Sequence, residues 1–70
     1  MTTWCVYIIA KEGKYYTGIT NHFQHRMEQH GVERALYVEN AKSAKDAARR
    51  EREIKGWNRV RKEALWKGRP

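Results

Sequence analysis

The stretch TWCVYIIAKEGKYYTGIT, residues 3–20, decides the fold. Two runs of apolar and aromatic residues, 3–10 and about 15–19, flank the turn signal KEGK, a pattern typical of a β-hairpin. Both faces of the first run are apolar, so we expect it to be the central strand of a sheet. Tyrosines in such a hairpin can simply cover a small core, so the stretch alone does not establish a function.

The rest of the chain predicts one more strand and three helices. Asn21 with Gln24 forms a capping box that predicts a helix over residues 22–30, and residues 34–40 are predicted as the third strand. Capping residues also mark the last two helices, which we expect over 44–55 and 59–68. The capping residues and helix-ending glycines are Gly31, Ser43 with Asp46, Gly56 and Asn58.

This ββαβαα order predicts an α+β fold, in which helices flank a small, three-stranded, mostly antiparallel sheet. At 70 residues we expect a single domain spanning 1–70, with a thin core. In the first helix, Phe23 and Met27 should face inward, while His22, Arg26 and His30 share a neighbouring stripe. The inward faces of the later helices are expected to consist of Ala44, Ala47, Ala48, Ile54, Val60, Ala64 and Leu65, with Trp57 at the joint.

The positive charge is confined to one part of the chain. Residues 1–40 hold four Lys or Arg against four Asp or Glu, whereas residues 41–70 hold eleven against four, so the second part carries the whole formal charge of +7. Such a concentrated basic surface favours a polyanion partner. The alternative is a solvated helix face that only keeps the protein soluble.

Other features narrow the class of protein. The single cysteine, Cys5, cannot form an internal disulfide, and no Cys/His cluster suits a structural zinc site. No apolar run approaches the roughly 20 residues that span a bilayer. We expect a cytoplasmic protein with no membrane partner.

An acidic residue inside the basic region suggests a metal site. Glu51 lies among Arg49, Arg50 and Arg52, and a carboxylate in such a surface can hold a metal ion beside a bound phosphate. The alternative is an ordinary ion pair with Lys55, one helical turn away.

Taken together, these motifs resemble the GIY-YIG endonuclease family over nearly the whole chain. VYI at 6–8 is similar to the first family motif, with Cys5 in place of its glycine, and YTG at 16–18 is similar to the second. The ending REREIKGWNRVRKEAL resembles small stand-alone bacterial members related to the nuclease domain of UvrC. The connection from His30 to Leu36 is shorter than in those members.

The resemblance implies a metal-dependent DNA endonuclease. Because so small a surface offers few base contacts, we expect it to select substrate structure more than sequence. The implied catalytic residues are Tyr7, Tyr16, Arg26, His30 and Glu51. Glu51 would hold one Mg²⁺ or Mn²⁺, which prefers oxygen ligands, and Arg26 would hold phosphate oxygens. Tyr7, Tyr16 and His30 are three candidates for the general base, and the sequence does not favour one of them over the others.

The remaining predictions concern the partner. We expect DNA, with single-stranded or branched forms favoured, to contact Thr17, Lys42, Lys45, Arg49, Arg52, Arg59, Arg61 and Lys62. The short connection after His30 leaves two alternatives open: a non-catalytic nucleic-acid-binding module, or a nuclease subunit that requires a protein partner.

Overall fold

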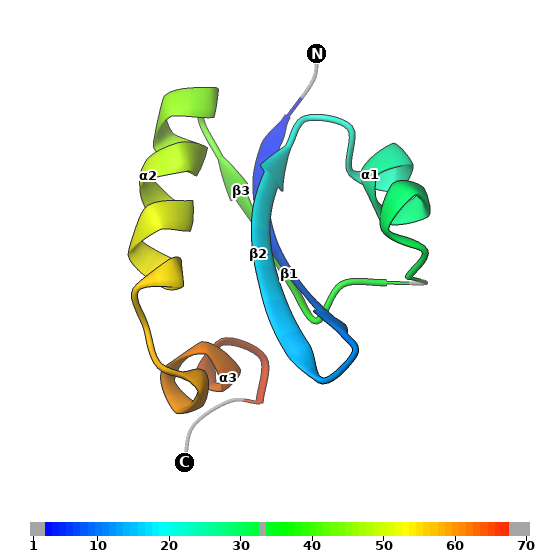
Figure 1. Ribbon diagram of the computed structural model, residues 1–70. Coiled ribbons are helices and arrows are strands. Elements are labelled where there is room, and N and C mark those ends of the chain that lie inside the picture. The colour runs from blue at the N-terminus through cyan, green and yellow to red at the C-terminus, as the bar shows by residue number, and fades with distance from the viewer. Residues whose placement is uncertain (1–2, 33, 68–70) are drawn as a thin grey trace.

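β1 (Trp4–Lys11) is the central strand of a three-stranded antiparallel sheet in the order β2-β1-β3 (Figure 1). In this computed structural model, which describes residues 3–32 and 34–67, β1 pairs with β2 (Lys14–Thr20) on one side and β3 (Tyr37–Ala41) on the other. The predicted hairpin and the predicted central position of its first strand are confirmed.

The hairpin turn consists of two residues, Glu12 and Gly13, both with positive φ, at 54° and 78°. Such a turn matches the right-handed twist of the flanking strands. It pairs Lys11 with Lys14 and, farther along, Tyr7 with Gly18. The two strands therefore run antiparallel from this turn in a fixed register.

Helices cover both faces of the sheet, and the predicted α+β order is confirmed (Figure 1). α1 (Phe23–His30) packs on one face, and α2 (Ala44–Lys55) packs on the other. α3 (Arg59–Lys67) lies on the side of α2, beside the hairpin turn. None of the helices within residues 3–32 and 34–67 has the length and apolar character needed to cross a membrane.

Four of the predicted helix ends are confirmed, including the end of α2 at Gly56. The Ser43 hydroxyl accepts a hydrogen bond from the backbone N–H of Asp46 at 3.1 Å, and Asn58 Oδ1 accepts one from Arg61 N–H at 2.8 Å. Gly31 closes α1 in the left-handed conformation, with φ 74°. These contacts satisfy backbone groups that a helix end leaves unpaired.

The predicted cap at Asn21 is wrong. α1 begins at Phe23, and its N-cap residue, His22, makes no side-chain capping bond. The hydroxyl of Thr20 instead accepts a hydrogen bond from the backbone N–H of His22 at 3.0 Å. Because β2 continues to Thr20, that buried hydroxyl reaches the start of the helix first.

The third strand begins at Tyr37, three residues later than predicted. Val32 and Ala35 pack against the core on the α1 side, so the chain approaches the sheet before it becomes extended. The Leu36 N–H already donates to the Ile8 carbonyl at 2.8 Å, outside the strand proper.

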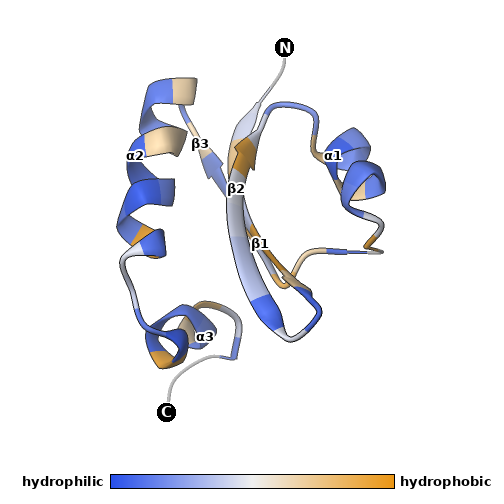
Figure 2. Cartoon of the chain, in the orientation of Figure 1, coloured by the Kyte–Doolittle hydropathy of each residue, from blue (hydrophilic) through white to orange (hydrophobic). Residues whose placement is uncertain are grey.

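The core has two parts, one on each face of β1. On the α2 side, four residues have no exposed surface: Val6, Ile8, Ala47 and Ile54. On the α1 side the buried cluster consists of Tyr7, Ile9 and Met27, with Phe23 packed against it. In Figure 2 the hydrophobic colour is concentrated in the sheet and at isolated positions of largely hydrophilic helices.

The predicted inward faces of α2 and α3 hold only in part. Ala47 and Ile54 are buried, and Ala48, Leu65 and Trp57 are half-buried. Ala44 and Ala64 are exposed, as is Val60 at 76%. α3 has no fully buried residue among those described, although Leu65 and Trp66 pack against the core.

α3 is held to the hairpin mainly through Tyr15. The Tyr15 hydroxyl donates a hydrogen bond to Glu63, and its ring contacts Trp66 edge-on at 5.2 Å. The guanidinium of Arg59 lies over the same ring at 4.2 Å and donates to the Gly13 carbonyl at 3.3 Å. These contacts orient α3 so that Val60 points to solvent.

Candidate active site

The phenol of Tyr7 lies across Gly18, its partner on β2. A Cβ atom on Gly18 would lie 2.5 Å from the Tyr7 hydroxyl oxygen and 2.7 Å from Cζ. Any side chain at this position would displace the ring. Because β2 is an edge strand, the missing side chain lets the Tyr7 hydroxyl reach toward the free edge of the sheet.

The Tyr7 hydroxyl is hydrogen-bonded to His30 Nε2 at 2.9 Å. Tyr7 is only 3% exposed, and the edges of Phe23 and His30 surround its ring. His30 is the last residue of α1, and the predicted core contacts of Phe23 and Met27 position that helix. The hydrogen bond therefore joins the central strand to the C-terminal end of α1.

Two charged residues act on Tyr7 from a distance. Burial raises the pKa of the Tyr7 phenol above its ordinary value of 10.0, Arg26 opposes that shift, and Cys5 and Glu51 add to it. Tyr7 is therefore neutral near pH 7 and can donate its proton to His30. Arg26 and Glu51 thus have opposite electrostatic effects on the same hydroxyl.

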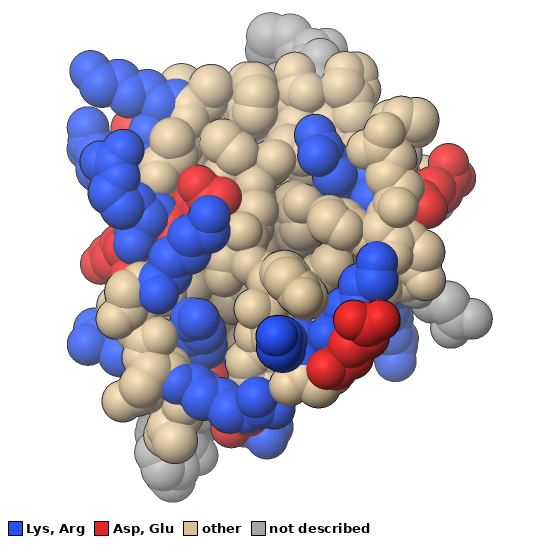
Figure 3. All heavy atoms as spheres, in the orientation of Figure 1, with Lys and Arg blue, Asp and Glu red and all other residues tan. Residues whose placement is uncertain are grey.

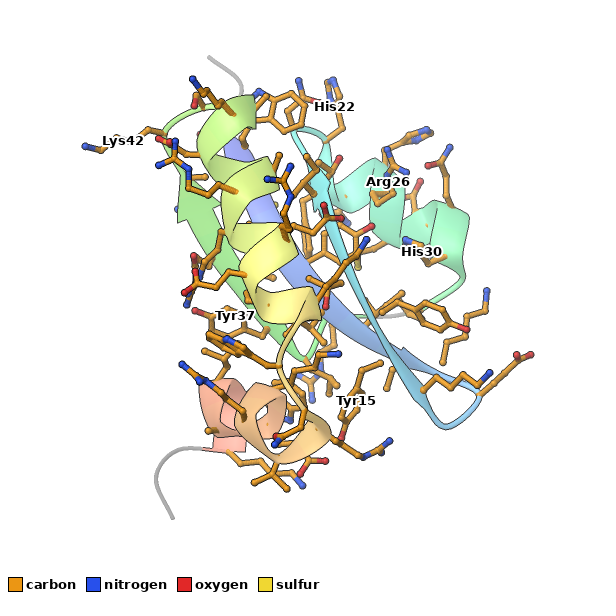
Figure 4. The ribbon with its side chains drawn as sticks, turned by 60° about the vertical axis from the view of Figure 1, so that its left-hand side comes forward. Tyr15, His22, Arg26, His30, Tyr37 and Lys42 are labelled. Carbon is orange, nitrogen blue, oxygen red and sulfur yellow. The ribbon has the colours of Figure 1, made fainter. Side chains whose placement is uncertain are left out.

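Arg26 approaches from α1. It lies one helical turn before His30, and its side chain is exposed. Figure 4 shows His22, Arg26 and His30 following one another along α1, on the same side of the molecule. A forked, permanently charged side chain in this position can hold phosphate oxygens that approach the Tyr7 hydroxyl.

Glu51 approaches from the opposite helix. Ala47 and Ile54 mark the core side of α2, and Arg50 pairs with Glu39 of β3 at 2.9 Å. At 3.6 residues per turn, Glu51 must lie on the other flank of that core stripe, over β2. Its side chain is 23% exposed and pairs with Lys55 at 3.3 Å. The predicted ion pair is therefore present, and it leaves part of the carboxylate accessible.

Tyr16 lies near the same edge of the sheet but is exposed. It pairs with Ile9, so it shares the sheet face of Gly18 and Tyr7. Its side chain is 44% exposed and lines a hollow of about 340 Å³ together with Lys11, Glu12 and His30. The two motif tyrosines thus differ: one is buried under α1, and the other faces solvent.

The donor set for a metal ion is small. No cluster of three or more His, Cys, Asp or Glu side chains occurs within residues 3–32 and 34–67. Glu51 provides one partly exposed carboxylate, on the flank of α2 that lies over β2. A single carboxylate fits Mg²⁺ or Mn²⁺, because Mg²⁺ usually keeps several waters and binds one or two protein carboxylates plus substrate phosphate. The donor set does not suit zinc, which takes three or four protein ligands.

The predicted DNA-contacting residues have different positions. Lys45, Arg49 and Arg52 form an exposed stripe on α2 opposite its core side, and Lys42 precedes the helix. Figure 3 shows Lys and Arg gathered over α2 and α3, with a largely uncharged area over β2. On α3, Arg59 is engaged with Glu63, and Lys62 is half-buried.

The two remaining predicted contacts, Arg61 and Thr17, have different surroundings. The guanidinium of Arg61 lies over the ring of Trp57, 4.4 Å from its centroid. Thr17 faces α2, and its hydroxyl is buried without a hydrogen-bond partner among the described residues. A phosphate could reach that hydroxyl only if neighbouring atoms moved.

Lys11 and Glu12 are site-lining residues that the sequence patterns did not identify. Both lie at the hairpin turn beside Tyr16 and His30. The available signal was a Glu-Gly turn between two lysines, which also describes an ordinary solvated hairpin tip.

Comparison with known proteins adds one match. The family model described as the GIY-YIG catalytic domain matches residues 3–35, which include β1, β2 and α1 and hold Tyr7, Tyr16, Arg26 and His30. No curated protein and no solved structure matches the chain, so the relation to UvrC stays a prediction. The matched segment, in which the two tyrosine motifs pair on neighbouring strands, is therefore similar to the GIY-YIG catalytic domain.

Proposed function

We propose that this chain is a metal-dependent endonuclease that hydrolyses DNA phosphodiester bonds and selects substrate structure more than sequence. The observation that carries the proposal is the Tyr7–His30 hydrogen bond beside the edge strand β2, whose Tyr7 hydroxyl is influenced by the charges of Arg26 on α1 and Glu51 on α2. Hydrolysis needs a proton acceptor and positive charge near the phosphoryl oxygens. The Tyr7–His30 pair would provide the proton acceptor, and Arg26 would provide part of the positive charge.

Tyr7 and His30 would act as a pair in moving the proton of the attacking water. A phenol whose pKa is raised by burial is a poor base alone near neutral pH. Its hydrogen bond to His30 Nε2 allows Tyr7 to pass its own proton to the imidazole as it takes one from water. Tyr16, which is exposed, would orient the substrate beside this pair.

Charge stabilisation would come from both helices. Arg26 would bind phosphate oxygens from α1. Glu51 would hold the divalent ion, which when bound supplies positive charge to the phosphoryl group and the leaving oxygen. Lys55, the ion-pair partner of Glu51, is exposed, so its side chain would turn toward solvent when the metal is bound.

The DNA strands on either side of the cleaved bond would follow the exposed cations of α2. Lys45, Arg49 and Arg52 lie one turn apart on the solvent side of that helix. Such a surface contacts phosphates and few bases, so affinity should fall steeply with salt.

The second candidate is a nucleic-acid-binding module without cleavage activity, alone or as a subunit that needs a protein partner. The Glu51–Lys55 ion pair favours it, because it neutralises the one carboxylate that would bind metal. The two candidates differ in whether DNA is cut.

Cleavage of labelled DNA by matched variants tests the proposal. Single-stranded, duplex and branched DNA would each be incubated with Mg²⁺, Mn²⁺ or chelator. Glu51→Gln should lower the cleavage rate by about 100-fold or more, the scale typical of a lost catalytic group. Glu53→Gln is the matched control, because Glu53 is exposed and pairs with Arg50 on the other flank of α2. Binding of all three DNAs without cleavage would establish the second candidate.

A further inference from the structure

The hollow beside Tyr16 lies next to the proposed catalytic pair. It has a volume of about 340 Å³, and His30, one of its lining residues, is hydrogen-bonded to Tyr7. Its other lining residues are Lys11, Glu12 and Tyr16, from the hairpin. A group bound there would therefore be close to any phosphodiester held at Tyr7.

One of the lining residues, Lys11, lies opposite a second lysine of the hairpin. Lys11 and Lys14 are direct cross-strand partners, and both are exposed. Like charges directly opposite each other destabilise a strand pair. Within residues 3–32 and 34–67, neither lysine is in an ion pair, so a phosphate bound between them would relieve the repulsion.

Tyr16 and Glu12 also line the hollow, and they are better suited to bind a base than a second phosphate. The ring of Tyr16 is exposed enough to stack on a base. The Glu12 carboxylate would repel a phosphate but accepts hydrogen bonds from an amino group. The two-residue turn holds Glu12 at φ 54°, at the rim of the hollow.

We propose that this hollow is a nucleotide subsite that takes an unpaired base bearing an exocyclic amino group, namely adenine, cytosine or guanine, from the strand to be cut. Lys11 and Lys14 bind its phosphate, Tyr16 stacks on the base, and Glu12 accepts from the amino group. A paired base remains stacked in its duplex and cannot reach Tyr16. The proposal rests on the proposed endonuclease function and names the substrate class that its site selects.

Binding of short homopolymers in chelator tests this without requiring cleavage. Wild type should bind a labelled deoxycytidine oligomer about 10-fold more tightly than the matching deoxythymidine oligomer, which lacks the amino group. Glu12→Gly, which removes the acceptor and suits the left-handed turn, should bring this ratio close to one, and Glu53→Gly, the matched change on α2, should leave it unchanged.

Lys11→Ala tests the phosphate contact separately. It should weaken binding of both oligomers equally and reduce the slope of log affinity against log salt by about one. Equal affinity of wild type for the two oligomers, or a ratio unchanged by Glu12→Gly, would overturn the subsite. A base preference without cleavage of any DNA would instead overturn the nuclease function and leave the subsite intact.

Discussion

The two faces of β1 differ in what they contact. On the α2 face, Val6 and Ile8 are fully buried against Ala47 and Ile54. On the α1 face, the buried Tyr7 keeps a polar atom that is hydrogen-bonded to His30. Because successive residues of a strand point to opposite faces, one strand can support stability on one side and chemistry on the other.

The α1 face is also the more thinly covered of the two. α1 has eight residues and contributes one buried side chain, Met27, whereas α2 has twelve and buries Ala47 and Ile54. A small domain has little stability to spare, about 0.05–0.15 kcal/mol per residue. We infer that the α2 face provides most of it, and substitutions on each face can test this difference.

The largest effect is expected from Ile54→Ala. Removing this fully buried side chain should lower the free energy of unfolding by about 2–5 kcal/mol, which is enough to unfold much of so small a domain. Met27→Ala, the matched change on the α1 face, should cost less. Urea denaturation followed by tryptophan fluorescence measures both. Equal losses would contradict the proposed difference between the faces.

Gly18→Ala should have the next largest effect. The added methyl group would collide with the Tyr7 phenol, and overpacking of this kind costs about 1–3 kcal/mol. We expect loss of cleavage together with this moderate destabilisation. Gly56→Ala is the control, since the nearest atom to its added Cβ would be 3.5 Å away, and it should leave stability and cleavage nearly unchanged. Full cleavage activity in Gly18→Ala would show that the position of Tyr7 is not critical.

Tyr7→Phe should separate stability from cleavage activity most clearly. Loss of one hydrogen bond should lower the free energy of unfolding by about 0.5–1.5 kcal/mol, while cleavage falls by about 100-fold or more. Tyr37→Phe removes a comparable bond, at 2.7 Å to Glu39, away from the site, and should leave cleavage unchanged. Similar cleavage rates in the two variants would remove Tyr7 from the mechanism.

The smallest effect is expected when the pH is lowered, which should weaken the contacts that attach α3 to the hairpin. The hydrogen bond from Tyr15, followed by Lys67 and Arg59, lowers the pKa of Glu63 below its ordinary value of 4.5. The resulting stabilisation is present above that pH and is lost as the pH falls through the lowered pKa. The NMR signal of the Trp66 indole should therefore shift below about pH 4.5. Glu63→Gln should abolish this step; its persistence would assign the step to another group.

The sequence predicted the elements well and several of their ends poorly. Two apolar and aromatic runs around a turn signal were enough for the hairpin, and the hydroxyl of Ser43 was enough for the start of α2. The start of α1 depended instead on Thr20, whose hydroxyl reaches His22 only after the sheet has formed. Local sequence patterns do not show which side chain will bond a backbone group when the competing side chain is positioned by the tertiary structure.

The exposure of Val60 has a similar cause. Its helical spacing favoured a buried position, yet the contacts of Tyr15 with Glu63 and Trp66 orient α3 differently. Those contacts join residues far apart in the sequence. Helical periodicity identifies an apolar stripe but does not show what the stripe will meet.

For the candidate site, the family motifs identified residues that the fold brings together. Tyr7 contacts His30, Tyr16 shares a hollow with His30, and both Arg26 and Glu51 influence the pKa of Tyr7. Their catalytic roles stay predictions. The burial of Tyr7 beside an exposed Tyr16 could not be foreseen, because it depends on how α1 covers one end of the hairpin.

The two-residue turn at Glu12 and Gly13 has a consequence for insertions and deletions. It determines that Tyr7 faces Gly18, and adding one residue to the hairpin would turn the side chains of β2 to the opposite faces of the sheet. The phenol would then meet a bulkier residue than glycine. The connection between α1 and β3 has no such role in this pairing. Natural or engineered length changes should therefore be tolerated in that connection and excluded from the hairpin.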